Sequence, residues 1–335
     1  MTDTTRQKIV FMTGATGYVG QRLAMRLAHA GHRVHALVRK STAKEVLDHP
    51  NIVLFEGDIL QPESIQAAIK GCAQVFHVAA LARLVHKDPN EFYRINVAGT
   101  ENVLKAAVGA GVEKFVLTST TGVLGPCLNQ PMREQDPRIY GYDNHYETSK
   151  QLAEMLVEQY NQNGLEALVV MPSRVYGPGI STYSNGVNRF ISGYLKKGFS
   201  VIPKCPTIAG NYVFLDDVVE GHLLAMQHGK GGERYILGGE NVAFGDFTKT
   251  IREVAGTGRF VTVPTFLIKA TALMAQLKAL ITRSSPELTP RMVERLFLHC
   301  QFSSDKAKSE LNYQVTPFRE GITKTIAHLK NGTHA

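Results

Sequence analysis

Two side chains four residues apart, Tyr146 and Lys150, are the strongest candidates for proton chemistry in this sequence. On a helix, residues at this spacing share one face. A free tyrosine titrates near pH ~10 and exchanges protons poorly at neutral pH. A neighbouring ammonium group stabilises the phenolate and lowers the pKa of the phenol. The pair therefore predicts proton exchange between Tyr146 and a substrate oxygen, with Lys150 tuning Tyr146.

A cluster of hydroxyl side chains, residues 118–121, ends a predicted buried strand over 114–119. A hydroxyl at the end of a strand can hydrogen-bond the same substrate oxygen and fix its orientation. Ser119 and Thr120 are the two candidates for this role.

A glycine-rich turn separates the first predicted strand, 8–13, from a predicted helix over 18–30. Such a turn lets the backbone approach a pyrophosphate, whose charge the helix N-terminus stabilises. The sequence therefore predicts a dinucleotide site, with contacts from Gly14, Thr16, Gly17, Tyr18, Val19 and Gly20.

The residues after the second predicted strand, 33–38, indicate which dinucleotide binds. An NAD site usually has an acidic residue here that accepts hydrogen bonds from the ribose. This chain has Arg39 and Lys40, and an arginine can bind a 2′-phosphate bidentately. NADP(H) is therefore favoured, with NAD(H) as the alternative, and Lys40 or Lys44 could assist Arg39.

Two further strand ends are expected to face the cofactor. Asp58 and Ile59 follow the third strand, 52–56, and Asp58 can either bind an adenine amino group or cap the next turn. Ala79 and Ala80 follow the fourth strand, 74–78, and their small side chains would let a flat ring lie against the backbone.

The order of these elements predicts an α/β fold. Short apolar strands alternate with amphipathic helices, including 63–70, 90–109 and 145–162, which is typical of a Rossmann-type doubly wound parallel sheet. We expect an NADP(H)-binding domain over 1–175. A smaller C-terminal α+β substrate lobe follows over 176–335, from which 211–228 returns to the first domain.

Composition excludes several classes of protein. The net charge of +8 comes from scattered lysines and arginines without a basic run, so a nucleic-acid partner is not expected. The four cysteines lie far apart, in neither disulfide nor metal-ligand spacing, so no metal site is expected. The polar N-terminus and the absence of a membrane-spanning apolar run predict a cytoplasmic protein without a membrane span.

Together these motifs resemble the extended branch of the short-chain dehydrogenase/reductase superfamily, over nearly the whole chain. The GxxGxxG turn, the hydroxyl cluster and the YxxxK pair occur in the expected order, and 96–100 and 213–218 resemble two further motifs of the family. The resemblance implies an oxidoreductase in which Tyr146 exchanges the proton and Lys150 also binds the nicotinamide ribose. It places Pro172 beside the cofactor. It aligns the catalytic hydroxyl with Thr120, or with Ser119 if the strand register differs by one residue.

Within the branch, local features resemble the dihydroflavonol reductase-like proteins, which are NADP(H)-dependent carbonyl reductases. These features are Arg39 and the segments 76–79 and 171–178. The nucleotide-sugar epimerases and dehydratases are the alternative, under the label NAD-dependent epimerase/dehydratase family. Dehydratases generally have an Asp-Glu pair where this chain has Thr121 and Gly122. Epimerases usually have an Asn near Arg174, after the sixth strand.

The predicted reaction is hydride transfer between NADPH and the carbonyl carbon of a small-molecule carbonyl or alcohol substrate. A non-catalytic, NADP(H)-binding redox sensor is an alternative of another class, but such a protein has no need of Tyr146 and Lys150. The helices 90–109 and 145–162 resemble those that pair subunits in this family, so a homodimer is expected.

Two features are left open by the residues alone. Arg174 could bind a substrate phosphate or carboxylate, or pair with a nearby acid. The apolar segment 266–283, which contains Leu273 and Leu277, is interpreted as a lid over an apolar substrate in preference to a membrane-surface helix.

Overall fold

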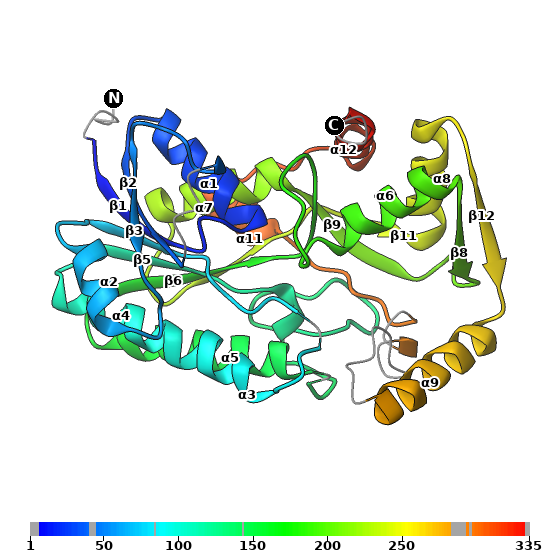
Figure 1. The fold of residues 1–335 in the computed structure, drawn as a ribbon, viewed down its shortest axis with the longest axis horizontal. Helices are drawn as coiled ribbons and strands as arrows, with labels where there is room; N and C mark the ends of the chain where they lie inside the picture. The colour runs from blue at the N-terminus through cyan, green and yellow to red at the C-terminus, as the bar shows by residue number, and fades with distance from the viewer. Residues whose placement is uncertain are drawn as a thin grey trace.

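The protein, described here from a computed structural model, is built on a seven-stranded parallel sheet (Figure 1). The structure describes residues 7–39, 45–83, 85–142, 144–282, 293–294 and 297–331. The strands, in sheet order, are β10 (Arg234–Leu237), β6 (Glu166–Pro172), β5 (Lys114–Thr118), β4 (Gln74–His77), β1 (Ile9–Thr13), β2 (Arg33–Val38) and β3 (Ile52–Glu56).

The predicted doubly wound parallel sheet is therefore confirmed. Its central strands are almost continuously apolar because helices cover both faces, as parallel sheets require. Residues Val10 to Met12 of β1 and Phe115 to Leu117 of β5 are fully buried. The predicted bounds of β2 and β3 agree with the structure. Each of the other predicted strands of this sheet differs from the structure by one residue, at one end only.

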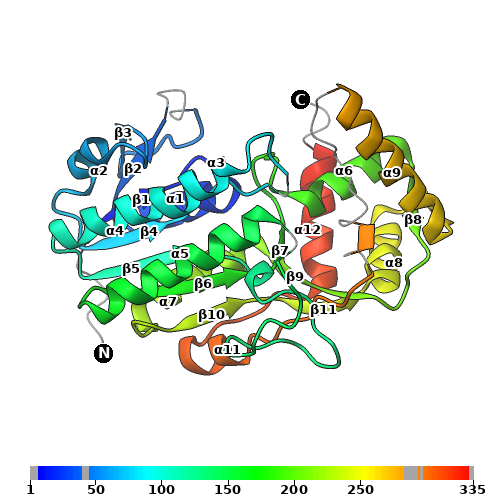
Figure 2. The same ribbon diagram turned by 90° about the horizontal axis from the view of Figure 1, so that it is seen from below.

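Helices pack in a layer on each face of this sheet (Figures 1 and 2). One layer contains α1 (Tyr18–His29), α7 (Leu215–His228) and α11 (Asp305–Leu311). The other contains α2 (Pro62–Ile69), α3 (Asn90–Tyr93), α4 (Gly99–Gly109) and α5 (His145–Gln162). The sheet is thus the middle of three layers, with an apolar core on either side.

The predicted helix over 90–109 is not a continuous α-helix. A π-helical turn, Arg94–Ala98, joins α3 to α4. Such turns are rare and often occur at functional sites. This one contains Asn96, whose side chain is fully buried.

The smaller lobe contains two short sheets. Strand β9 (Ala209–Phe214) lies between β7 (Arg174–Tyr176) and β11 (Glu240–Ala243), and β8 (Phe199–Pro203) pairs with β12 (Arg259–Val263). Helices α6 (Gly186–Lys197), α8 (Phe244–Ala255) and α12 (Phe318–Asn331) pack around them. Their shared core is largely aromatic, with contributions from Tyr176, Tyr194, Tyr212, Phe214, Phe247 and Phe318.

The chain passes between the two lobes several times. Helix α7 packs against α1 under the large sheet, while β9, just before it, belongs to the smaller lobe. Strand β10 and α11 also join the large sheet and its helices, although the sequence analysis assigned both to the smaller lobe. Short strands such as β10 carry no periodic signal that distinguishes one sheet from another.

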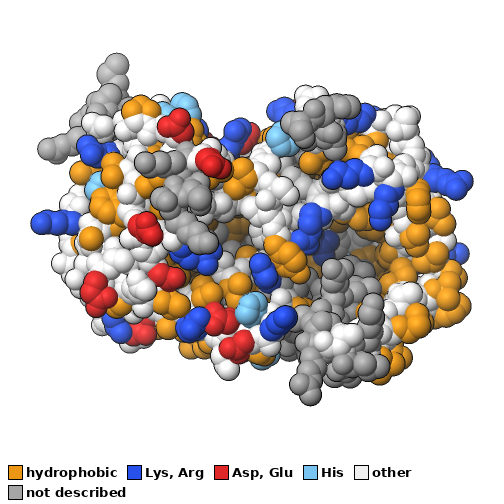
Figure 3. All heavy atoms as spheres, viewed as in Figure 1, with side chains coloured by type: hydrophobic (Ala, Val, Ile, Leu, Met, Phe, Trp, Pro, Cys, Tyr) orange, Lys and Arg blue, Asp and Glu red, His pale blue; other side chains and the backbone are white. Residues whose placement is uncertain are grey.

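The expected lid is not packed as predicted. Helix α9 (Thr265–Thr282) covers most of the predicted segment, and residue 283 lies outside the described residues. Leu273 and Leu277 are each 52% exposed, and Ala272 is the one buried side chain among those described in this helix. Apolar composition alone predicted burial, but this helix presents its apolar side chains to solvent, at the right-hand edge of Figure 3.

Candidate active site

The strand order of the large sheet reverses between β1 and β4. The connections that follow the two strands at such a point lead to opposite faces of the sheet, which leaves a crevice at the carboxyl ends of these strands. The glycine turn follows β1, Ala79 and Ala80 follow β4, and the hydroxyl cluster follows β5. Topology therefore places the predicted cofactor and catalytic residues at one edge of the sheet.

The glycine turn is packed too closely for any side chain. Gly14 has φ +72°, and a Cβ on it would lie 2.5 Å from the backbone nitrogen of Ala79. A Cβ on Gly20 would lie 2.0 Å from the carbonyl oxygen of Gly14. Gly17 donates a backbone hydrogen bond to that same oxygen, at 2.9 Å. These contacts hold the turn against the end of β4.

Helix α1 begins directly after this turn with an open N-terminus. Its N-cap, Gly17, provides no side-chain cap, and no acidic residue lies in the first turn. Unpaired N–H groups and the helix dipole make such an end suitable for a phosphate group. The turn and the helix end therefore fit the pyrophosphate of a dinucleotide, with Thr16 exposed and Val19 half-buried beside them.

The side chain of Tyr18 is engaged within the protein. Its hydroxyl donates a hydrogen bond of 2.7 Å to the carbonyl oxygen of Gly177, and the side chain is buried. The phenol thus joins α1 to the loop after β7. A cofactor contact from Tyr18 is left to its backbone N–H.

The side of the crevice predicted to hold the adenine is formed by β2 and β3. Arg39 is exposed at the end of β2, and Lys40 and Lys44 lie outside the described residues. Asp58 caps the following turn, because its Oδ1 accepts a hydrogen bond of 2.9 Å from Leu60 N. Ile59 packs against Gly99, and a Cβ on Gly99 would lie 2.6 Å from Ile59 Cδ1.

A buried histidine ties the ends of β1 and β4 to α4. His77 Nδ1 lies 2.7 Å from Thr13 Oγ1, and His77 Nε2 lies 2.9 Å from Thr100 Oγ1. Thr100 donates to the carbonyl oxygen of Asn96, and Thr13 accepts from Ala79 N. Burial, together with the charge of Lys150, lowers the pKa of His77 to about 3, so the imidazole is neutral.

Asn96 extends this network to the catalytic helix. Its Oδ1 accepts a hydrogen bond of 2.7 Å from Leu81 N, and its Nδ2 donates one of 2.9 Å to Ser149 Oγ. Ser149 Oγ in turn donates to the carbonyl oxygen of Tyr146, at 2.8 Å. The motif over 96–100 is recognisable in the sequence, but its pattern does not indicate this role for Asn96.

Tyr146 and Lys150 lie on α5, one turn apart, as predicted. Asn144 caps this helix, its side chain accepting from Glu147 N at 2.9 Å. Burial raises the pKa of the Tyr146 phenol to about 12, Glu147 adds to the rise, and a hydrogen bond with the Thr120 side chain opposes it. The expected lowering of this pKa is therefore wrong, because desolvation of the phenolate outweighs the hydrogen bond with Thr120.

Burial lowers the pKa of Lys150 to about 8, and the nearby Glu154 opposes this shift. The fully enclosed ammonium group loses hydration, which favours its neutral form. Lys150 therefore remains charged at neutral pH but titrates within a range that an assay can reach.

The hydroxyl side chains at the end of β5 point to different partners. Thr118 Oγ1 lies 2.8 Å from His222 Nε2, and Ser119 donates a short hydrogen bond to Glu154. Thr120 Oγ1 accepts from Gly122 N at 3.1 Å and hydrogen-bonds with Tyr146. Of the two candidates for the catalytic hydroxyl, Thr120 lies beside the phenol, and Ser119 is engaged elsewhere.

A buried ion pair fastens the loop after β5 onto α5. Arg138 lies 2.7 Å from Glu147, and both side chains are largely buried. The same guanidinium donates to the carbonyl oxygens of Gly122 and Val123, at 2.6 and 2.9 Å. Sequence spacing gave no signal for this contact, which holds the Thr120 loop against the helix that carries Tyr146.

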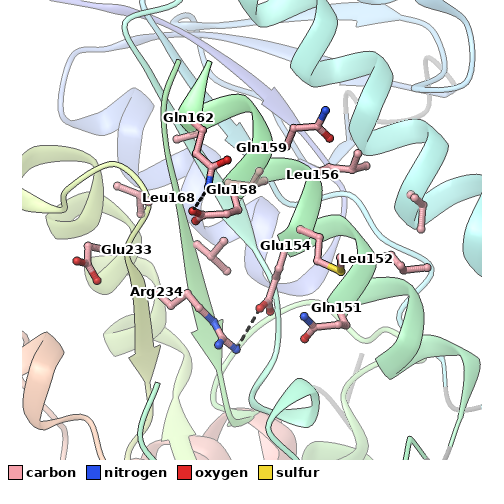
Figure 4. Close-up of a pocket in the computed structure, with 16 residues that line it drawn as sticks. Gln151, Leu152, Glu154, Leu156, Glu158, Gln159, Gln162, Leu168, Glu233 and Arg234 are labelled. Atoms are coloured by element: carbon pink, nitrogen blue, oxygen red, sulfur yellow. Dashed lines mark hydrogen bonds and ion pairs between the residues drawn. The ribbon is translucent and has the colours of Figure 1, made fainter. Parts of the chain in front are cut away.

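A separate groove of about 580 Å³ lies on the outer face of α5, away from the crevice (Figure 4). Leu152, Met155 and Gln159 line it, facing Leu168 and Arg234. Glu154 pairs with Arg234 here, at 3.1 Å. Tyr146, Lys150 and the glycine turn do not line this groove, which therefore belongs to a different surface.

Within the described residues, no cluster of three or more His, Cys, Asp or Glu side chains is arranged to hold a metal ion. The described helices include none that is both long and apolar enough to cross a membrane.

Comparison with known proteins agrees with this fold. The model of the NAD dependent epimerase/dehydratase family matches residues 10–238. A putative dihydroflavonol 4-reductase of Synechocystis is 31% identical over 330 residues, covering 96% of this chain and 94% of the relative.

Two solved structures share the fold. The crystal structure of gox2253 is 33% identical, with a TM-score of 0.82, covering 97% of this chain and 99% of that one. A UDP-glucose 4-epimerase from Thermotoga maritima, solved with UDP-glucose, is 23% identical, with a TM-score of 0.80 and the same coverage of each chain.

Proposed function

We propose that this chain, which belongs to the NAD dependent epimerase/dehydratase family, is an NADP(H)-dependent carbonyl reductase of the dihydroflavonol reductase-like kind. The family is one of NAD(P)-dependent enzymes of the extended short-chain dehydrogenase/reductase type. The observation that carries the proposal is the half-buried Tyr146 phenol, hydrogen-bonded with Thr120 and one helical turn from Lys150.

The three side chains divide the work on the substrate oxygen. When bound, the reduced cofactor supplies a hydride to the carbonyl carbon. Tyr146 gives its phenolic proton to the carbonyl oxygen, and its raised pKa keeps that proton in place at neutral pH. Thr120 orients the oxygen, and the charge of Lys150 favours the phenolate that remains.

The preference for NADP(H) rests on Arg39, which is exposed at the end of β2. No acidic residue stands at this position to bind the ribose of NAD or to repel a 2′-phosphate. A guanidinium in this place suits a 2′-phosphate because it can donate two parallel hydrogen bonds.

The proposed substrate is a small-molecule carbonyl compound, or its alcohol in the reverse direction. The interpretation of 266–283 as a lid predicts an apolar substrate. The apolar side chains of α9 are exposed, so this helix gives no support for an apolar substrate.

We also propose that two copies of the chain pair through α4 and α5. Apolar side chains are exposed on these helices, namely Val108 at 54%, Leu152 at 36% and Met155 at 57%. Helices α4 and α5 pack against each other, and exposed apolar side chains on adjacent helices favour an interface between protein chains.

Replacing Tyr146 with Phe removes the proton donor but keeps the ring. We expect kcat for reduction of an aromatic aldehyde by NADPH to fall about 10² to 10⁴-fold, while the affinity for NADPH is unchanged. Tyr160, on the same helix but outside the crevice, provides the matched control Tyr160→Phe. A Tyr146→Phe enzyme with near-full turnover would overturn the proposal.

Replacing Arg39 with Asp should reverse the cofactor preference. Titration followed by the cofactor's own fluorescence is expected to show that the unaltered protein binds NADPH about 10-fold or more tightly than NADH, because the charge-assisted contact is lost with NADH. Arg33→Asp, at the other end of the same strand, should leave this preference intact. NAD retained tightly through purification, with weak NADPH binding, would instead support a nucleotide-sugar epimerase.

Size-exclusion chromatography with light scattering tests the proposed pairing. The expected mass is twice the chain's 36.8 kDa. Met155→Glu should give the mass of one chain, because a carboxylate in an apolar interface loses its hydration. Val201→Glu, at an equally exposed apolar position on β8, is the control that should stay paired. A single-chain mass for the unaltered protein would contradict the pairing.

A further inference from the structure

Arg174 lies at the start of β7, immediately beyond the catalytic edge of the large sheet. Ser119 N donates a hydrogen bond of 2.7 Å to the carbonyl oxygen of Val170, in the neighbouring strand. The chain from Val170 to Arg174 can span at most about 14 Å, even fully extended. Arg174 is therefore within reach of a substrate whose carbonyl group lies at Thr120 and Tyr146.

The guanidinium of Arg174 is held by the strand beside it. Its Nη1 donates to the hydroxyl of Tyr212 at 3.4 Å, and its Cζ lies 5.5 Å from the centre of the Tyr212 ring. Arg174 and Tyr212 are register partners in the pairing of β7 with β9. The aromatic ring stabilises the positive charge without neutralising it.

Gly210 leaves the space that the guanidinium occupies. A Cβ at this position would lie 2.1 Å from Arg174 Nη1. Gly210 is in β9, paired with Val242 on one side and bridged to Cys300 on the other. The small residue therefore fixes where the arginine side chain can lie.

Arg174 has no acidic partner in the part of the chain that the structure describes. Arg22, Arg138, Arg234 and Arg319 each form an ion pair with a carboxylate, whereas no described carboxylate lies within ion-pair distance of Arg174. The side chain of Arg174 is exposed to solvent, so an incoming anion can reach its guanidinium. Figure 3 shows the surface hollowed between the two lobes.

We propose that Arg174 binds an anionic group of the substrate, a carboxylate or a phosphate, and so determines which carbonyl compounds the enzyme accepts. This inference rests on the proposed function, because it identifies the binding site for the part of the substrate that lies away from the reacting carbonyl group. A guanidinium donates two parallel hydrogen bonds to either anion. Held over Tyr212 with no described carboxylate to compete, it is already oriented for such a ligand, which lowers the entropy lost on binding.

Binding of benzoate and of benzamide tests the site without requiring turnover. The two probes share shape and differ in charge. Calorimetric titration is made on protein saturated with NADP⁺, or with NAD⁺ if that cofactor binds instead. We expect benzoate to bind about 10-fold or more tightly than benzamide, since a hydrogen-bonded charge pair is formed.

Arg174→Met should abolish this preference, while Arg33→Met, which removes the same charge at the opposite edge of the large sheet, should retain it. Gly210→Ala keeps the charge of Arg174 but displaces its guanidinium, so it should also abolish the preference for benzoate. If Arg174→Met fails to fold, the result for Gly210→Ala tests the inference in its place. Equal binding of the two probes to the unaltered protein, or a preference that survives both substitutions, would overturn the inference.

The two proposals fail separately. Selective benzoate binding by a protein that transfers no hydride would overturn the proposed reaction and leave the anion site standing. Reduction of aldehydes by a protein that binds benzoate and benzamide equally would do the reverse.

Discussion

A chain of buried hydrogen bonds runs from Thr13 at the end of β1, through His77, Thr100, Asn96 and Ser149, to the backbone of Tyr146. The Thr13–His77, His77–Thr100 and Asn96–Ser149 links cross from one element to the next, so the positions of β1, β4, α4 and α5 depend on one another. Buried polar groups are costly unless all are paired, and a fully paired network is correspondingly rigid. Asn96, which joins α4 to α5 in this network, lies in the π-helical turn Arg94–Ala98.

Burial of the catalytic pair has opposite effects on its two members. The phenol of Tyr146 holds its proton more firmly, and the ammonium group of Lys150 holds its proton less firmly. Both shifts have the same cause, which is that a buried group favours its neutral form. Within the proposed reaction, the result suits a proton donor at neutral pH, provided that the charge of Lys150 is present as the proton leaves.

Local sequence signals predicted the parallel sheet, the bounds of β1 to β6 to within one residue, the glycine turn and the shared helix of Tyr146 and Lys150. Such signals report on residues that are close in the chain. The Arg138–Glu147 pair and the packing of Gly210 beside Arg174 depend on tertiary contacts instead. The spacing of these residues in the sequence does not indicate either contact. The raised pKa of Tyr146 was missed for the same reason, because the sequence displays the neighbouring ammonium group but not the depth of burial.

The dependence of kcat/KM on pH tests the central claim, that Tyr146 donates a proton under the influence of a charged Lys150. For reduction of an aromatic aldehyde, measured from about pH 6 to about pH 10, kcat/KM should be level at low pH and fall as pH rises through about 8. Lys150 loses its charge in that range, while Tyr146, with a pKa of about 12, keeps its proton. A value of kcat/KM that instead rises with pH would indicate a deprotonated base in the reductive direction and would contradict this account.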